Sequence, residues 1–206
     1  MSAMLSAGAA ALVAGCTAGV GGVAPPGPAG QQALQHLRGQ VTGPTAVSPV
    51  FADGAAHDVA IAVMKQLTNP VVPEVDVYRW VRTSWHALAR VTLDVGGSVA
   101  ADTGTTTPIA TADITPAQVP DLLVTVHYNA GPATAVVSAL GGRWHALTFH
   151  GGLAQDGTER FDVTVGADGS LSSRENDCVP DCADGHLVTT VYRFDPGTGR
   201  LVGQAG

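Results

Sequence analysis

The chain has 206 residues, a formal net charge of −7, and 13% charged against 45% apolar residues, of which few are aromatic. Its ten basic residues form no basic run, which excludes a nucleic-acid-binding surface and a polybasic membrane patch. The charge content is well below the roughly 25% of an average soluble domain and is more typical of a secreted or envelope protein.

The N-terminal segment has the pattern of an export signal. Residues 1–37 contain no Asp, Glu, Lys or Arg, and residues 4–14 are an apolar run of small side chains. This run is far shorter than the roughly 20 residues that a membrane-spanning helix needs, and it matches the apolar region of a signal peptide. It ends in Leu-Val-Ala-Gly-Cys at residues 12–16, which resembles the lipobox of bacterial lipoprotein signal peptides.

The resemblance, which covers these sixteen residues, implies that residues 1–15 are removed and that the sulfur of Cys16 carries a lipid. Two acyl chains give stable anchoring, so we expect an extracytoplasmic protein anchored to the cell membrane by its lipid. Residues 16–30 are dominated by Gly and Pro, which is typical of a flexible linker. We expect one globular, β-rich domain over residues 31–206, because about 170 residues suffice for a hydrophobic core.

Two segments at the start of this domain have the pattern of short helices. Residues 31–39 are mostly helix formers, and Gly43-Pro44 follows them as a stop signal. Residues 55–68 place apolar side chains on one helical face, and Asn69-Pro70 would end that helix. The apolar face consists of Val59, Ala60, Val63 and Leu67.

The rest of the domain alternates short apolar stretches with turns rich in Gly, Pro and Asn, which predicts antiparallel hairpins. The expected strands are residues 75–81, 87–95, 122–128, 133–140, 143–150, 161–165, 170–173, 187–194 and 200–203, with a long loop at 96–120. The predicted fold class is therefore α+β, with one or two short helices packed on a curved antiparallel sheet of hairpins. The alternative is an all-β sandwich or barrel.

The acidic loop around Cys178 and Cys182 is the most distinctive local feature. If Cys16 carries a lipid, these two cysteines form an even pair, and outside the cytoplasm such a pair oxidises to a disulfide. Two metal sites are alternatives for this loop. One is a calcium ion on Asp177, Asp181 and Asp184, and the other is a zinc ion on Cys178, Cys182 and His186. Apart from these, we expect no cofactor other than the covalent lipid.

Tryptophan and histidine recur on the expected strands. Trp-His-Ala-Leu occurs at residues 85–88 and again at 144–147. His145 and His150 are five residues apart on one expected strand, so they face opposite sides of it. If the strands concerned are neighbours, a candidate pocket is lined by Trp85, His86, His127, Trp144, His145 and His150.

Enzyme motifs give no catalytic assignment. The sequence has no G-x-S-x-G, S-x-x-K, H-E-x-x-H or phosphate-binding glycine loop. We therefore expect a non-enzymatic binding or interaction module, whose partner is an envelope protein, a wall polymer or a small ligand. The alternative is an extracytoplasmic hydrolase that uses His127, His145 and His150 with nearby aspartates.

Overall fold

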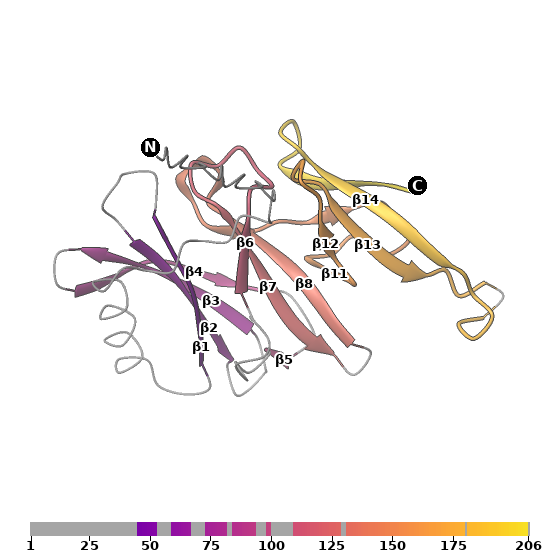
Figure 1. Cartoon of the computed structure of the whole chain (residues 1–206), viewed down its shortest axis with the longest axis horizontal. Helices are drawn as coiled ribbons and strands as arrows, with labels where there is room; N and C mark the ends of the chain where they lie inside the picture. The colour runs from indigo at the N-terminus through magenta and orange to yellow at the C-terminus, as the bar shows by residue number, and fades with distance from the viewer. Residues whose placement is uncertain are drawn as a thin grey trace, which may run out of the picture.

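Strands make up most of the chain that the computed structural model describes, which comprises residues 45–52, 59–66, 73–81, 84–93, 98–99, 109–128, 131–179 and 181–205. The predicted signal peptide, Cys16, the linker and the predicted helix at residues 31–39 lie outside these ranges. The described strands form three sheets, which follow one another along the long axis of the molecule in Figure 1. We call them the first, central and C-terminal sheets.

The first sheet is an antiparallel meander in which each strand pairs with the next one along the chain. Its strands are β1 (Thr45–Ala52), β2 (Val59–Gln66), β3 (Pro73–Val81) and β4 (Ser84–Thr92). The helix predicted over residues 55–68 is wrong, because β2 is an interior strand paired on both sides. Val59, Ile61 and Val63 are β-branched and favour an extended backbone. The segment is an unbroken apolar run, and such a run is compatible with the periodicity of a helix and with that of a strand.

The α+β prediction is thereby corrected to all-β, the alternative that the hairpin pattern also allowed. Within the described ranges there is no α-helix, and the one helical element is the 3-10 turn η1 (Leu140–Gly142). The predicted antiparallel hairpins are confirmed, and they stack as three sheets instead of forming one sheet covered by helices.

The central sheet has the order β11-β8-β7-β5, with β6 also paired to β7 and β9 to β8. Its strands are β5 (Ser98–Val99), β6 (Ile109–Ala112), β7 (Asp121–Tyr128), β8 (Gly131–Ser138), β9 (His145–Ala146) and β11 (Glu159–Phe161). The C-terminal sheet has the order β10-β15-β14-β13-β12, in which β10 runs parallel to β15. Its strands are β10 (Phe149–His150), β12 (Thr164–Val165), β13 (Leu171–Asn176), β14 (Leu187–Asp195) and β15 (Arg200–Ala205).

The strand predicted over residues 143–150 is divided between two sheets. Its first part, β9, pairs with β8 of the central sheet, and its second part, β10, pairs with β15 of the C-terminal sheet. The chain crosses between the sheets at Leu147 and Thr148, and Leu147 is buried there. His145 and His150 consequently belong to different sheets.

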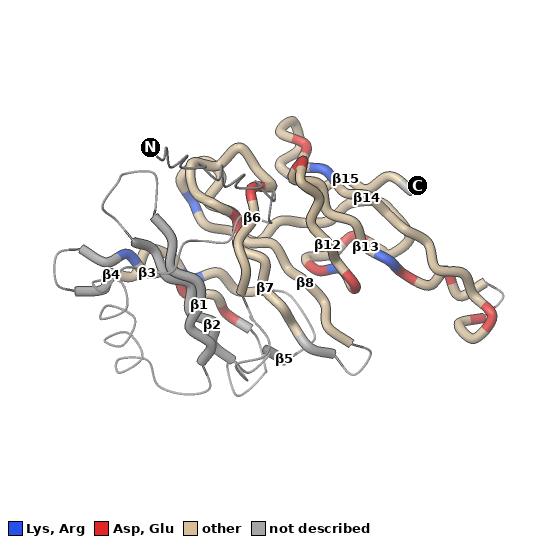
Figure 2. The backbone as a smooth tube through the Cα atoms, in the orientation of Figure 1, with Lys and Arg blue, Asp and Glu red and all other residues tan. Residues whose placement is uncertain are grey.

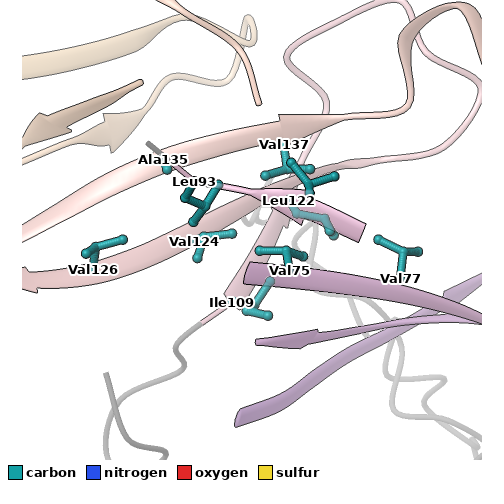
Figure 3. Packing of buried hydrophobic residues seen from close by; sticks show 10 residues of the cluster. Val75, Val77, Leu93, Ile109, Leu122, Val124, Val126, Ala135 and Val137 are labelled. Atoms are coloured by element: carbon teal, nitrogen blue, oxygen red, sulfur yellow. The ribbon is translucent and has the colours of Figure 1, made fainter. Parts of the chain in front are cut away.

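Both faces of the central sheet are buried. Along β7, Leu122 and Val124 join the core against the first sheet, while Leu123 joins the core against the C-terminal sheet. Figure 3 shows the first of these cores, where β7 and β8 meet Val75 and Val77 of β3. Because a strand covered on both sides needs apolar residues at successive positions, β7 and β8 are nearly continuous apolar runs.

Candidate functional site

A cavity of about 780 Å³ lies at one end of the space between the first and central sheets. It is lined by Arg79 of β3, by residues 116–119 before β7, by residues 139–142 after β8, and by Trp144. Val119 and Trp144 also pack against the buried core between these two sheets. The cavity therefore adjoins this core.

Arg79 reaches the cavity because of its position in the alternation of β3. Val75, Val77 and Arg79 fall on the same side of the strand, and the two valines are fully buried in the core against the central sheet. Glu74 and Asp76 fall on the opposite side. They are buried there beside Arg90, whose Nε lies 2.9 Å from Asp76 Oδ1 and 3.5 Å from Glu74 Oε2. The acidic groups of β3 are thus separated from the cavity by the sheet itself.

Two turns form the remainder of the lining. In η1, Gly141 and Gly142 have φ angles of 65° and 76°. Residues other than glycine rarely adopt this backbone conformation. On the other side, Asp121 holds the loop that leads into residues 116–119. Its Oδ2 accepts hydrogen bonds from the backbone amides of Ile114 and Thr115, at 2.9 and 2.7 Å. A buried carboxylate thus fixes one wall of the cavity.

The described lining of the cavity contains few polar side chains. Among the described lining residues, Arg79 is the single charged side chain, Gln118 supplies an amide, and Trp144 supplies a large ring. None of them carries the carboxyl, imidazole, thiol or hydroxyl group that general acid–base or nucleophilic catalysis uses. Figure 2 shows acidic segments in the first sheet, beside β6, along the C-terminal sheet and in the loop closed by the disulfide.

The structure distributes the predicted tryptophans and histidines over all three sheets. Trp85 and His86 lie on β4, Trp144 and His145 lie at or beside β9, and His150 is on β10. His127 of β7 pairs with Pro132, whereas His145 pairs with Ser138. Pro132 and Ser138 are about 20 Å apart along β8, because an extended strand rises about 3.3 Å per residue. Of the predicted residues with described side chains, Trp144 is the one that lines the cavity.

Arg79 and Gln118 line the cavity but were not among the predicted site residues. For Arg79 a signal was available, since it continues the inward-facing series of Val75 and Val77, and a charged residue at an inward position marks an unusual site. Gln118 lies in an irregular loop without periodicity, so only the folded arrangement reveals its place in the lining.

The predicted disulfide between Cys178 and Cys182 is present. With both sulfurs bonded to each other, the thiolates of the zinc alternative do not exist in this state. Asp177 Oδ1 accepts the backbone amides of Val179 and His186, at 3.1 and 2.8 Å. Asp181 Oδ1 similarly accepts the amides of Ala183 and Asp184, at 2.9 and 3.0 Å. These carboxylates brace the turn, and no metal-holding group of His, Cys, Asp and Glu occurs among the described residues.

An imidazole–carboxylate pair closes the exposed loop after β10. His150 Nδ1 lies 2.6 Å from Asp156 Oδ2, and Asp156 Oδ1 accepts the backbone amide of Gly151 at 3.1 Å. The hydrogen bond from His150, followed by that from Gly151, lowers the pKa of Asp156. Both side chains are about half exposed, so the pair fastens a surface loop.

Because several aspartates accept hydrogen bonds in turns of this kind, we expect the stability of the fold to decrease in acid. Hydrogen bonds lower the pKa of Asp156, Asp168, Asp177 and Asp195, and the leading contributor at Asp168 is the Ser170 hydroxyl, followed by Arg193. A carboxyl whose pKa is lowered by folding stabilises the folded state above its ordinary pKa, near 4, and this stabilisation is lost as the pH falls through the lowered value.

We expect the midpoint of urea unfolding to vary little between about pH 7 and pH 5 and to fall below about pH 4. Asp168→Asn should reduce the midpoint at neutral pH, and its difference from the unsubstituted chain should become smaller as the pH falls from about 4 to about 2, because protonation of Asp168 in the unfolded chain progressively removes its advantage. A main loss between pH 7 and pH 5 would contradict this prediction, because it would assign the acid sensitivity to histidines.

Comparison of the chain with models of known protein families, with curated proteins and with solved structures gives no match in any of the three. Within the described part of the chain, no helix is both long and apolar enough to cross a membrane.

Proposed function

We propose that the chain is a lipid-anchored binding module of the bacterial cell envelope, which takes up a small ligand or a unit of a wall polymer. The observation that carries the binding role is the lining of the cavity between the first and central sheets. It combines Arg79, Gln118 and Trp144 with turn backbone and apolar side chains, and its described members include no acid–base or nucleophilic group. Such a mixture of apolar surface with a few polar groups is typical of ligand-binding sites.

The proposed location is supported by the N-terminal sequence. The apolar residues 4–14, the lipobox-like residues 12–16 and the Gly/Pro-rich residues 17–30 together form the order of elements that a tethered extracytoplasmic domain requires. The disulfide between Cys178 and Cys182 is in keeping with an oxidising compartment. A flexible linker would let the domain sample the space near the membrane while the cavity stays accessible.

The anchor is tested by expressing the full chain and its Cys16→Ser variant in a bacterium that processes lipoproteins. We expect the unsubstituted chain in the membrane fraction, with an N-terminal peptide that begins at Cys16 and carries acyl chains by mass spectrometry. The Cys16→Ser variant should lose the lipid and keep its signal peptide. Cys178→Ser is the matched control, because it also removes one thiol but leaves the lipobox intact. Equal processing of the Cys16→Ser variant and the unsubstituted chain would disprove the anchor.

A further inference from the structure

We propose that the peptide bond between Asp184 and Gly185 is a site of spontaneous modification, at which the main chain rearranges through a succinimide to isoaspartate. The Gly185 nitrogen attacks Cγ of the protonated Asp184 carboxyl and forms a C–N bond, and the amide proton leaves with the carboxyl hydroxyl as water. Water then opens the ring. Cleavage between the nitrogen and the main-chain carbonyl carbon gives isoaspartate, whereas cleavage at Cγ restores aspartate, so the net mass is unchanged.

The sequence does not distinguish this pair from the others of its kind. Asp-Gly occurs at residues 53–54, 156–157, 168–169 and 184–185, and in three of these cases an alanine precedes it. The first pair lies outside the described residues. The other three contain the same reacting atoms, so their structural surroundings decide which of them reacts.

At Asp156–Gly157 both reacting groups are engaged. The Gly157 amide donates to the carbonyl of Phe149 at 3.2 Å. The Asp156 carboxylate is hydrogen bonded to His150 Nδ1 and to the amide of Gly151. These bonds, with that of His150 the largest contributor, lower the pKa of Asp156 and leave little of the protonated carboxyl that the reaction requires.

At Asp168–Gly169 both groups are engaged as well. The Gly169 amide donates to the carbonyl of Gly166 at 3.1 Å. Asp168 Oδ1 accepts the Ser170 hydroxyl at 2.6 Å, and Oδ2 accepts Arg193 Nη1 at 2.6 Å. The bond from Ser170, followed by that from Arg193, lowers the pKa of Asp168, so its protonated form is also scarce.

At Asp184–Gly185 both groups are available. Asp184 is exposed in the loop between β13 and β14, and its own amide donates to Asp181 Oδ1 at 3.0 Å. Within the described part of the chain, neither the Asp184 carboxylate nor the Gly185 amide has a hydrogen-bond or ion-pair partner. This pair therefore lacks the protection that the other two have.

Packing explains why a glycine follows Asp184. A Cβ at residue 185 would overlap Asn176 Oδ1 and lie 2.8 Å from the backbone nitrogen of Cys178. Asn176 Oδ1 in turn accepts that Cys178 amide at 2.8 Å. The fold of the loop requires glycine at this point, and glycine offers no side chain that would hinder attack by its own nitrogen.

The test follows isoaspartate in the full chain with Cys16→Ser, which avoids the lipid. The folded protein is kept at neutral pH and body temperature for several weeks, and is then reduced, alkylated and digested with trypsin. Cleavage after arginine places the three pairs in separate peptides, residues 144–160, 161–174 and 175–193. An isoaspartyl methyltransferase with isotopically labelled S-adenosylmethionine marks isoaspartate, and mass spectrometry locates the label.

We expect the label in residues 175–193 to exceed that in either other peptide by about tenfold, which corresponds to about 1.4 kcal/mol, the order of one hydrogen bond. In concentrated urea, where the protecting hydrogen bonds are lost, the three peptides should be labelled to a similar extent. Equal labelling in the folded chain would overturn the inference. A tenfold excess that persists in urea would also overturn it, because the preference would then belong to the sequence.

Variants assign the label to one residue. Asp184→Glu should abolish the label in residues 175–193, because a glutamyl side chain would have to close a larger ring that forms more slowly. Asp162→Glu is the matched control, since it makes the same substitution at another exposed aspartate and should leave that label unchanged. A label that survives in Asp184→Glu would place the reaction at Asp177 or Asp181 and overturn the site.

Discussion

Replacing Arg160 with methionine is expected to lower the free energy of unfolding by about 3–5 kcal/mol, the range seen when one partner of a buried polar arrangement is removed. The Arg160 side chain is 3% exposed and lies between the central and C-terminal sheets. Its Nε donates to the Tyr192 hydroxyl at 2.8 Å, and its Nη2 donates to the carbonyl of Gln155 at 3.0 Å. Methionine keeps an unbranched apolar side chain at this position but none of these donors.

The surroundings of Arg160 explain why the loss is large. Its guanidinium lies 5.0 Å from the ring centre of Phe149 and 5.3 Å from that of Tyr192, within the range of cation–π attraction. Tyr192 also donates to the carbonyl of Gly151 at 3.1 Å, so one hydroxyl links Arg160 to the loop after β10. Glu175 lies 3.9 Å away and would be left partly buried without its nearest cation. Removing Arg160 thus leaves several acceptors without a donor.

Urea unfolding of Arg160→Met, Arg160→Lys and Arg174→Met measures this effect. The lysine variant keeps the charge but not the fork of donors, so its loss should be intermediate. Arg174 is more than half exposed and lies 3.9 Å from Asp162, so Arg174→Met should change the unfolding free energy by less than about 1 kcal/mol. An Arg160→Met variant as stable as the unsubstituted chain would show that apolar packing replaces the network without cost.

Replacing Asp121 with alanine is expected to cost about 3 kcal/mol, because it removes the acceptor of several buried donors at once. Asp121 is fully buried, and besides the amides of Ile114 and Thr115 it accepts the Thr115 hydroxyl at 2.9 Å. That hydroxyl lies 2.9 Å from the Ser138 hydroxyl of β8, so the group joins the loop to the sheet. Alanine leaves two backbone N–H groups in an apolar setting without a partner.

The matched variant for this position is Asp121→Asn. Its single carbonyl oxygen can still accept both amides, and its NH₂ group can donate to the Thr115 hydroxyl, so we expect about half the loss of the alanine variant. Unfolding by urea measures both variants. Equal stability of the alanine and asparagine variants would contradict the proposed role of the carboxylate.

The candidate site shows which of its residues a local sequence pattern can predict. Trp144 is conspicuous in the sequence, and it does line the cavity. Its neighbours there, Arg79 and Gln118, come from a strand and a loop that are far away along the chain. The grouping with His127 and His150 required adjacent strands, yet β7 and β10 belong to different sheets. Residue type marks a candidate, whereas the composition of a site depends on which strands become neighbours.

The sequence by itself determined the features that depend on short stretches of chain. Short apolar stretches and the turns between them predict the β7–β8 and β14–β15 hairpins, and the pair of cysteines in one loop predicts the disulfide. Only the tertiary structure decided that residues 59–66 form a strand and not a helix. An unbroken apolar run is compatible with either, and the strand is selected because β1 and β3 pair with it by hydrogen bonds on both sides. It also decided the stacking of three sheets and the cavity between two of them, since both arise from burial against residues distant in the chain.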